Sequence, residues 1–244
     1  MSANELQNCV QNRNLSELQN LIISRKVSVD IPLDQGLTAL MIATKRSDIE
    51  IMELLLSLNA SVTVKDESGK TALMHACICD NLQAAKVLHR NGAPFEDFDF
   101  GGSSPLHHAV DSGSCEIISW MIRVGADVDI RDKNAAWTPL MRCASLSGNK
   151  SVAKTLIFDG ANIDLRDNDG KTCLIIAVMN DHEQLVELLL ESNVNVTILN
   201  KSGRTAYEIA VALKKTAIIK ILDKYIKSRK NNIPKEETRN VSVT

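Results

Sequence analysis

The chain has 244 residues, with 28 Lys and Arg against 30 Asp and Glu, for a formal net charge of −2. This near-neutral balance argues against a nucleic-acid-binding protein, because such domains carry a strong basic bias. Since 44% of the residues are hydrophobic but only 3% are aromatic, we expect a core of aliphatic side chains, which suits stacked helices better than a β-sandwich or a barrel.

The N-terminal segment MSANELQNCVQNRNLSEL is polar and lacks the basic start and apolar stretch of a signal peptide. No uninterrupted apolar run approaches the roughly 18 residues that a membrane-spanning helix needs. We therefore expect a protein with no membrane partner, in the cytoplasm, the nucleus or both. In such a reducing compartment the six scattered cysteines are expected to be thiols.

A repeat of 33 or 34 residues runs through the rest of the chain. A hydroxyl residue opens each helical stretch and would cap its free N–H groups; these residues are Thr38, Thr71, Ser104, Thr138, Thr172 and Thr205. A glycine lies two residues before five of the six, and Ala136 takes its place in the fourth. Gly or Asn follows the second helix of most units, where the chain needs a left-handed residue.

Each unit is predicted to hold a turn with Asp and Gly, a short helix and a second, amphipathic helix. One such unit cannot bury its apolar stripe alone, so neighbouring units must stack. This predicts an all-α solenoid of about seven helix-turn-helix units, capped at both ends, over residues 1–230. The expected units are 1–32, 33–64, 65–97, 98–130, 131–165, 166–198 and 199–230.

The motif SPLHHA at Ser104–Ala109 resembles the T-P-L-H-x-A signature of the ankyrin repeat. The stretch from Trp137 to Leu190, with its longer SLSGNK loop, resembles the ankyrin half of the fibronectin type III and ankyrin repeat family. That resemblance implies a role in transcription or apoptosis control in germ cells. The chain starts directly in its first helix pair, so the fibronectin module of the family is not expected here.

Catalytic and cofactor motifs are absent from the sequence: it has no phosphate-binding loop, no dinucleotide fingerprint and no nucleophile elbow. The acids of the turns recur with the repeat and are interpreted as structural. His75, Cys79 and His108 could share one side of the stack as zinc ligands, but the cysteines mostly replace small apolar residues of the repeat. We therefore expect no enzyme activity, cofactor, metal site or small-molecule substrate.

Partner binding is the function that the repeat favours. In stacked ankyrin units the hairpin tips and the exposed side of the short helices line a concave face, and its variable positions are free for recognition. The candidate partner-binding residues at these positions are Lys65, Glu67, Lys70, Phe98, Phe100, Asp111, Arg131, Asn134, Trp137, Arg166, Asn168 and Lys171.

Three of these candidates, Phe98, Phe100 and Trp137, are aromatic and fall on adjacent tips that are expected to be exposed. Aromatic side chains often anchor interfaces, so the cluster indicates a binding surface. The alternative is that the rings cover an irregular turn, because Ala136 replaces the usual glycine beside Trp137. Phe95 could join this cluster, although its position more often packs inward, and Trp120 is expected to lie in the core.

The chain is expected to be a monomeric adaptor or regulator that binds a protein partner. A second hypothesis is a stoichiometric inhibitor or assembly chaperone of one enzyme or proteasomal subunit. Residues 231–244 are expected to form a basic, flexible tail; from residue 224 onward there are six basic and two acidic residues. Such a tail could be a weak nuclear-import or nucleic-acid patch, although direct nucleic-acid binding is not expected.

Overall fold

The computed structural model describes residues 2–231, and within that range the chain forms fourteen α-helices in seven consecutive pairs. The first helices of the pairs, here called inner helices, are α1 (Ser2–Gln11), α3 (Ala39–Lys45), α5 (Ala72–Ile78), α7 (Pro105–Ser112), α9 (Pro139–Leu146), α11 (Cys173–Met179) and α13 (Ala206–Ala212). The second, outer helices are α2 (Leu15–Ile23), α4 (Ile49–Ser57), α6 (Leu82–Arg90), α8 (Cys115–Arg123), α10 (Lys150–Phe158), α12 (Glu183–Glu191) and α14 (Thr216–Asn231). A 3-10 turn, η1, spans Asp34–Gly36.

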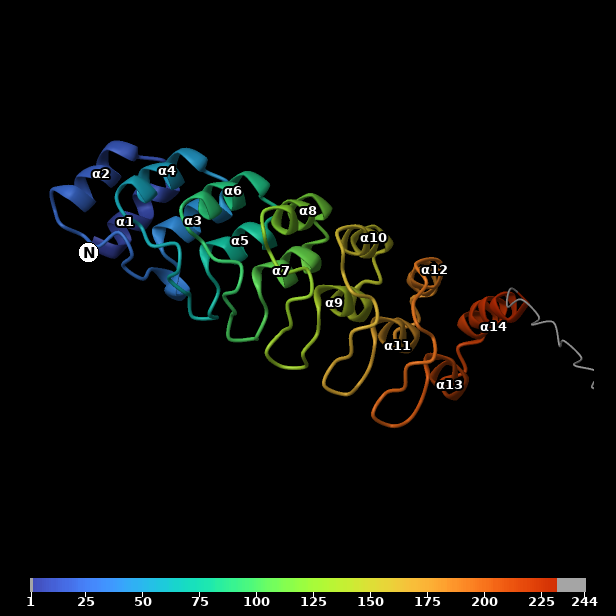
Figure 1. The fold of residues 1–244 in the computed structure, drawn as a ribbon. Coiled ribbons are helices and arrows are strands. Elements are labelled where there is room, and N and C mark those ends of the chain that lie inside the picture. Colours follow the sequence, from blue (N-terminus) through green and yellow to red (C-terminus); the bar gives the residue numbers. More distant parts are fainter. Residues whose placement is uncertain (1, 232–244) are drawn as a thin grey trace, which may run out of the picture.

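The helix pairs stack side by side into an elongated solenoid (Figure 1). Inner helices form one layer, outer helices form a second, and the connecting loops project from the inner layer as a row of hairpins. Each expected unit contains one helix pair, with α14 running one residue past residue 230; the limits of the units stay a prediction. Of the predicted tail 231–244, only Asn231 lies among the described residues.

The predicted hydroxyl caps are present in all six inner helices that follow a hairpin. The side-chain oxygens of Thr38, Thr71, Ser104, Thr138, Thr172 and Thr205 each accept a hydrogen bond from the backbone N–H three residues later. Because these N–H groups have no partner within the helix, each cap fixes where an inner helix begins. The caps therefore recur at equivalent positions in the structure as well as in the sequence.

One continuous apolar core runs between the two helix layers along the whole stack. Leu40, Leu73, Leu106, Leu140 and Leu174 occupy equivalent places in five inner helices and are all at most 1% exposed. Phe95 is buried, as expected, and its ring stacks on His89 while Trp120 packs edge-on against both. Burial of aliphatic side chains between neighbouring units thus supplies the main stabilisation of the solenoid.

Candidate protein-binding face

Backbone hydrogen bonds join each hairpin tip to the one before it. The N–H groups of Glu67, Phe100, Lys133, Asn168 and Lys201 donate to the carbonyls of Gln35, Ser68, Gly102, Ala135 and Asp169, over 2.9–3.2 Å. The tips are therefore linked into one continuous edge beside the inner helices. This edge and the exposed ends of the inner helices form the face that is expected from the sequence to be concave.

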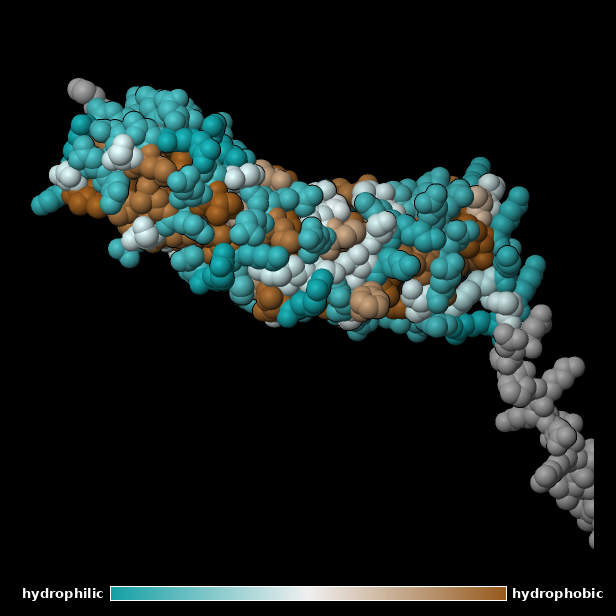
Figure 2. Space-filling model, turned by 90° about the horizontal axis from the view of Figure 1, so that it is seen from above, coloured by the Kyte–Doolittle hydropathy of each residue, from teal (hydrophilic) through white to brown (hydrophobic). Residues whose placement is uncertain are grey.

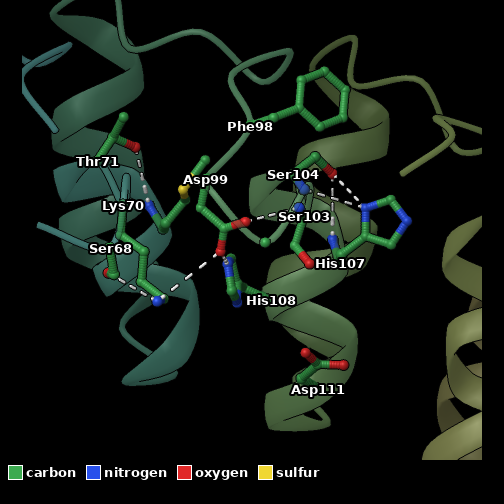
Figure 3. A network of polar contacts seen from close by, with 12 residues as sticks. Ser68, Lys70, Thr71, Phe98, Asp99, Ser103, Ser104, His107, His108 and Asp111 are labelled. Carbon is green, nitrogen blue, oxygen red and sulfur yellow. Dashed lines mark hydrogen bonds and ion pairs between the residues drawn. The ribbon is translucent and has the colours of Figure 1, made fainter. Parts of the chain in front are cut away.

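Behind the tips, a buried carboxylate accepts hydrogen bonds from the backbone of each of four hairpins, and in two of them it also contacts a histidine. Asp66 accepts hydrogen bonds from the N–H groups of Ser68 and Lys70 at 2.8 and 2.9 Å, and its other oxygen lies 2.8 Å from Nε2 of His75. The next unit repeats the pair, with Asp99 Oδ2 2.9 Å from His108 Nε2 (Figure 3). Each pair ties its hairpin to the inner helix of the same unit.

The pKa shifts of these groups follow from burial and hydrogen bonding. Burial alone would raise the pKa of Asp66, but the hydrogen bonds from Ser68, Lys70 and His75 outweigh it and lower this pKa to about 2. For His75 and His108, burial disfavours the charged ring and lowers the pKa of each imidazole, although the neighbouring aspartate opposes this shift. The histidines thus act as neutral hydrogen-bond partners at neutral pH.

His107 links two units. Its Nδ1 lies 2.8 Å from the Ser104 hydroxyl, and its Nε2 lies 3.0 Å from the backbone carbonyl of Trp137 in the following unit (Figure 3 shows the Ser104 contact). Burial lowers the pKa of His107, and the hydrogen bond to Trp137 only partly offsets this effect. His107 thus joins the hairpin cap of its own unit to the backbone of the next.

The solenoid is expected to lose stability on mild acidification. Unfolding exposes His75, His107 and His108, whose pKa values then return to the ordinary 6.5. Below that pH the unfolded chain binds more protons than the folded chain, so the free energy of unfolding falls, by at most about 1.4 kcal/mol per pH unit for each histidine. Above pH 7 it should be flat with respect to these three groups.

Urea titrations at pH values between 7.5 and 5 measure the slope of the free energy of unfolding against pH. His75→Gln is the matched variant, since it keeps a polar side chain but cannot take up the proton, and it should reduce the slope. A slope that is the same in the variant, or a wild-type protein equally stable at pH 5 and 7.5, would contradict the expectation.

The three candidate aromatic residues are not equally exposed. Phe100 is 76% exposed at its tip, as predicted. Phe98 is half-buried, and the Lys133 ammonium lies 4.2 Å from the centre of its ring. Trp137 is half-buried against the core, and its indole N–H donates to Asp167 Oδ2 at 3.1 Å. The expected exposure of Phe98 and Trp137 is therefore wrong, because groups of the following hairpin cover both rings. Their part in binding stays a prediction.

Five polar candidates connect neighbouring hairpins. Each side chain donates a hydrogen bond to a backbone carbonyl of another hairpin, over 2.6–3.2 Å. The donor and acceptor residues are Lys65 and Phe98, Arg131 and Arg166, Arg166 and Leu199, Asn134 and Gly101, and Asn168 and Asn134. Each bond spans 33–35 residues of sequence and so joins successive units. These side chains thus hold the tips together, and any contact with a partner would compete with that role.

The remaining four candidates have different neighbours. Lys70 donates to the Ser68 hydroxyl at 2.9 Å and lies 4.0 Å from Asp99, and Lys171 pairs with Asp169 at 2.6 Å. Asp111 forms a two-pronged ion pair with Arg142 of the next unit, at 2.9 and 2.7 Å. Glu67 is exposed at its tip. Hence Glu67 and Phe100 are the candidates whose side chains have the fewest partners within the chain.

Sequence reasoning missed part of an apolar row at the ends of the inner helices. Leu146 in α9 and Leu213 after α13 lie eight residues after their capping threonines and are 57% and 48% exposed. Met179, seven residues after Thr172, is 42% exposed. The signal was an apolar residue seven or eight residues after the cap, which places the three at or just after the ends of inner helices in successive units.

The alternative zinc site does not form among residues 2–231, where no three His, Cys, Asp or Glu side chains are grouped so as to hold a metal ion. Nε2 of His75 and of His108 is hydrogen-bonded to an aspartate instead. Over the same residues, no helix combines the length and apolar character needed to cross a membrane.

Comparison with known proteins agrees with this architecture. The family model for ankyrin repeats (3 copies) matches residues 6–99, 59–132, 92–167 and 140–232. The chain is 46% identical over 56 residues to the fibronectin type 3 and ankyrin repeat domains 1 protein of Mus musculus, and 50% identical over 54 residues to its Homo sapiens counterpart. These alignments cover 23% and 22% of the chain and only 16% of each relative.

Two solved structures resemble most of the stack. The ankyrin repeat domain of Bcl-3, described as a member of the IkappaB protein family, superposes with a TM-score of 0.81 at 25% identity, over 90% of this chain and 97% of that one. A chain in the complex of the predatory endopeptidase Bd0816 from Bdellovibrio bacteriovorus with the immunity protein Bd3460 gives 0.66 at 26% identity, over 76% and 96%. With its repeated caps, stacked helix pairs and matching family model, this chain belongs to the ankyrin-repeat family.

Proposed function

We propose that the chain is a non-enzymatic adaptor or regulator that binds a partner protein on its concave face. The observation that carries this proposal is Phe100, a large aromatic side chain 76% exposed on a hairpin tip whose backbone is already bonded to the neighbouring tip. Aromatic residues on an exposed, rigid surface are the usual anchors of protein interfaces. The hairpin edge supplies the rigid support.

The apolar row supports the same face. Leu146, Met179 and Leu213 leave hydrophobic surface in contact with water at the ends of inner helices in three successive units, and these exposed apolar side chains offer a partner hydrophobic surface to bury. Glu67 and the ion pair between Asp111 and Arg142 add charge towards the N-terminal units.

A finer role follows only from the resemblance. The two mammalian relatives combine fibronectin type 3 and ankyrin repeat domains, as their names state. We propose that this protein shares the role implied by that resemblance, in control of transcription or apoptosis in germ cells, in the nucleus or the cytoplasm. This part of the proposal depends on likeness over less than a quarter of the chain.

The second candidate is a stoichiometric inhibitor or assembly chaperone that holds one enzyme or proteasomal subunit. It is supported by the likeness to a chain from a complex between an endopeptidase and an immunity protein. A single tight partner that contacts all seven helix pairs would favour this candidate, and several partners of moderate affinity would favour the adaptor.

Affinity capture with purified chain tests the proposed face. Phe100→Ala is expected to weaken retention of the main partner at least about tenfold, since an interface anchor is worth on the order of 2 kcal/mol. Phe158→Ala is the matched control, because Phe158 is 88% exposed at the end of α10 in the outer layer. Equal retention by both variants, or a loss confined to Phe158→Ala, would contradict the proposal.

A further inference from the structure

The outer helices of the last two units carry opposite charges in ordered rows. In α12 the exposed residues include Glu183, Glu187 and Glu191, spaced four apart and therefore on one side of the helix. In α14 the exposed residues include Lys220, Lys224 and Lys227, spaced four and three apart. We call these the Glu row and the Lys row.

The two rows lie next to each other. Glu187 and Lys220 are 33 residues apart, as are Glu191 and Lys224, so the members of each pair hold equivalent places in successive units. The helices α12 and α14 are in contact. An acidic ridge and a basic ridge thus run side by side over the outer layer at the C-terminal end of the stack.

A groove of about 410 Å³ separates the rows. Its lining residues are Glu187, Leu190 and Glu191 from α12 and Ile221, Lys224, Tyr225 and Ser228 from α14. The buried hydroxyl of Tyr225 has no hydrogen-bond partner among the described residues. Figure 2, which looks down on the outer layer, shows brown hydrophobic surface among teal side chains at this end of the molecule. The groove is therefore an apolar strip flanked by opposite charges.

None of the six charged side chains is used within the stack. The ion pairs formed among residues 2–231 include none of the Glu row and none of the Lys row. The nearby pair between Lys215 and Asp181, at 3.1 Å, belongs to the loops before these helices. Both rows are consequently available to a second molecule.

We propose that this surface binds a second copy of the chain in a two-fold symmetric dimer. A two-fold axis that runs along the groove, parallel to the helices, places the Glu row of each copy over the Lys row of the other. The apolar walls of the two grooves then meet in the middle, with charge pairs on both sides, as in helical assemblies where flanking charges select the partner. The monomer expected from the sequence and the dimer proposed here are distinguished by sedimentation equilibrium, described below.

The distribution of charge favours a second copy over other occupants. A nucleic acid or an anionic membrane would be attracted by the Lys row but repelled by the adjacent Glu row. A two-fold axis across the helices would place Glu over Glu and Lys over Lys, which like-charge repulsion disfavours. All six charged side chains meet an opposite charge only on a surface that carries an acidic and a basic row in mirrored order. A second copy of the chain carries such a surface.

The size of the surface predicts a weak dimer. The 16 residues of α14 rise about 24 Å, and two helices side by side are about 20 Å wide. Two copies would therefore bury about 1,000 Å² in total, the lower limit for a specific interface, so we expect a dissociation constant on the order of 10–100 µM. Because charge pairs contribute, association should weaken as salt is raised.

Sedimentation equilibrium on three forms of the full chain tests the proposal. One variant carries Glu183→Lys, Glu187→Lys and Glu191→Lys, and the other carries Lys220→Glu, Lys224→Glu and Lys227→Glu. We expect the wild type to dimerise at low salt and each variant alone to stay monomeric, because like charges then meet across the axis. An equal mixture of the variants should dimerise again, since each row then faces its opposite.

Lys150→Glu with Lys154→Glu is the matched control, because these exposed lysines lie on α10, outside the proposed contact. It should dimerise like the wild type. A wild type that stays monomeric well above 100 µM, on the order of the weakest constant expected, overturns the proposal and leaves the groove to another occupant. Variants that dimerise alone, or a mixture that stays monomeric, overturn it as well. Circular dichroism of each variant confirms that these exposed changes leave the fold intact.

Discussion

Replacing Asp66 by alanine is expected to lower the free energy of unfolding by about 3 kcal/mol. The Asp66 carboxylate is only 8% exposed and accepts hydrogen bonds from two backbone N–H groups, from the Ser68 hydroxyl and from the His75 ring. Without it, the ring of His75 and the N–H groups of the hairpin lose their acceptor while still largely withdrawn from water. Urea denaturation at pH 7.5 measures the loss.

Asp169→Ala is the matched control for this change. Asp169 is also a carboxylate in a hairpin turn, but its side chain is 67% exposed and pairs only with Lys171. An exposed pair of this kind contributes less than about 1 kcal/mol. If the two variants lost the same stability, the buried carboxylate would have no special role in the hairpin.

Replacing Gly69 by alanine is expected to cost about 3 kcal/mol, for two separate reasons. Gly69 has a φ of +80°, which an L-residue with a side chain adopts at a cost. An added Cβ would also lie 2.5 Å from the backbone nitrogen of Phe100 in the next hairpin. The clash would push that hairpin away and break the hydrogen bond from the Phe100 N–H to the Ser68 carbonyl.

Gly203→Ala separates the two reasons. Gly203 has a similar φ of +70°, but no described atom lies within 4 Å of the position its Cβ would take. Its substitution should cost only the left-handed conformation, about 1 kcal/mol. Thermal unfolding of both variants gives the comparison, and equal losses would show that close contact between hairpins contributes nothing.

The fold was predictable because its main determinants are local. A hydroxyl cap, a turn aspartate and a left-handed residue each act within a few residues, and they recur every 33–35 residues. Ala136, which breaks the glycine series, still adopts a φ of +58°, so the hairpin is kept without the usual residue. Because the other units repeat the same pattern, the fold of the unit with Ala136 could also be predicted from the sequence.

The candidate face was less predictable because its exposure depends on the neighbouring unit. Trp137 was expected at an exposed tip, yet it is covered because its indole reaches Asp167, 30 residues later. Arg131 and Arg166 likewise bond to carbonyls in the following hairpin. Sequence position within one unit identifies which residues lie at a tip, but the packing between units decides which of them face water.

Hydrogen exchange of the chain, free and bound to its captured partner, tests the central claim most directly. The account predicts slower exchange on binding along the hairpin tips from residue 66 to residue 171 and at the ends of α9 and α11, with the outer helices α4, α6, α8 and α10 unchanged. Slower exchange confined to those outer helices, with the tips unchanged, would contradict binding on the concave face.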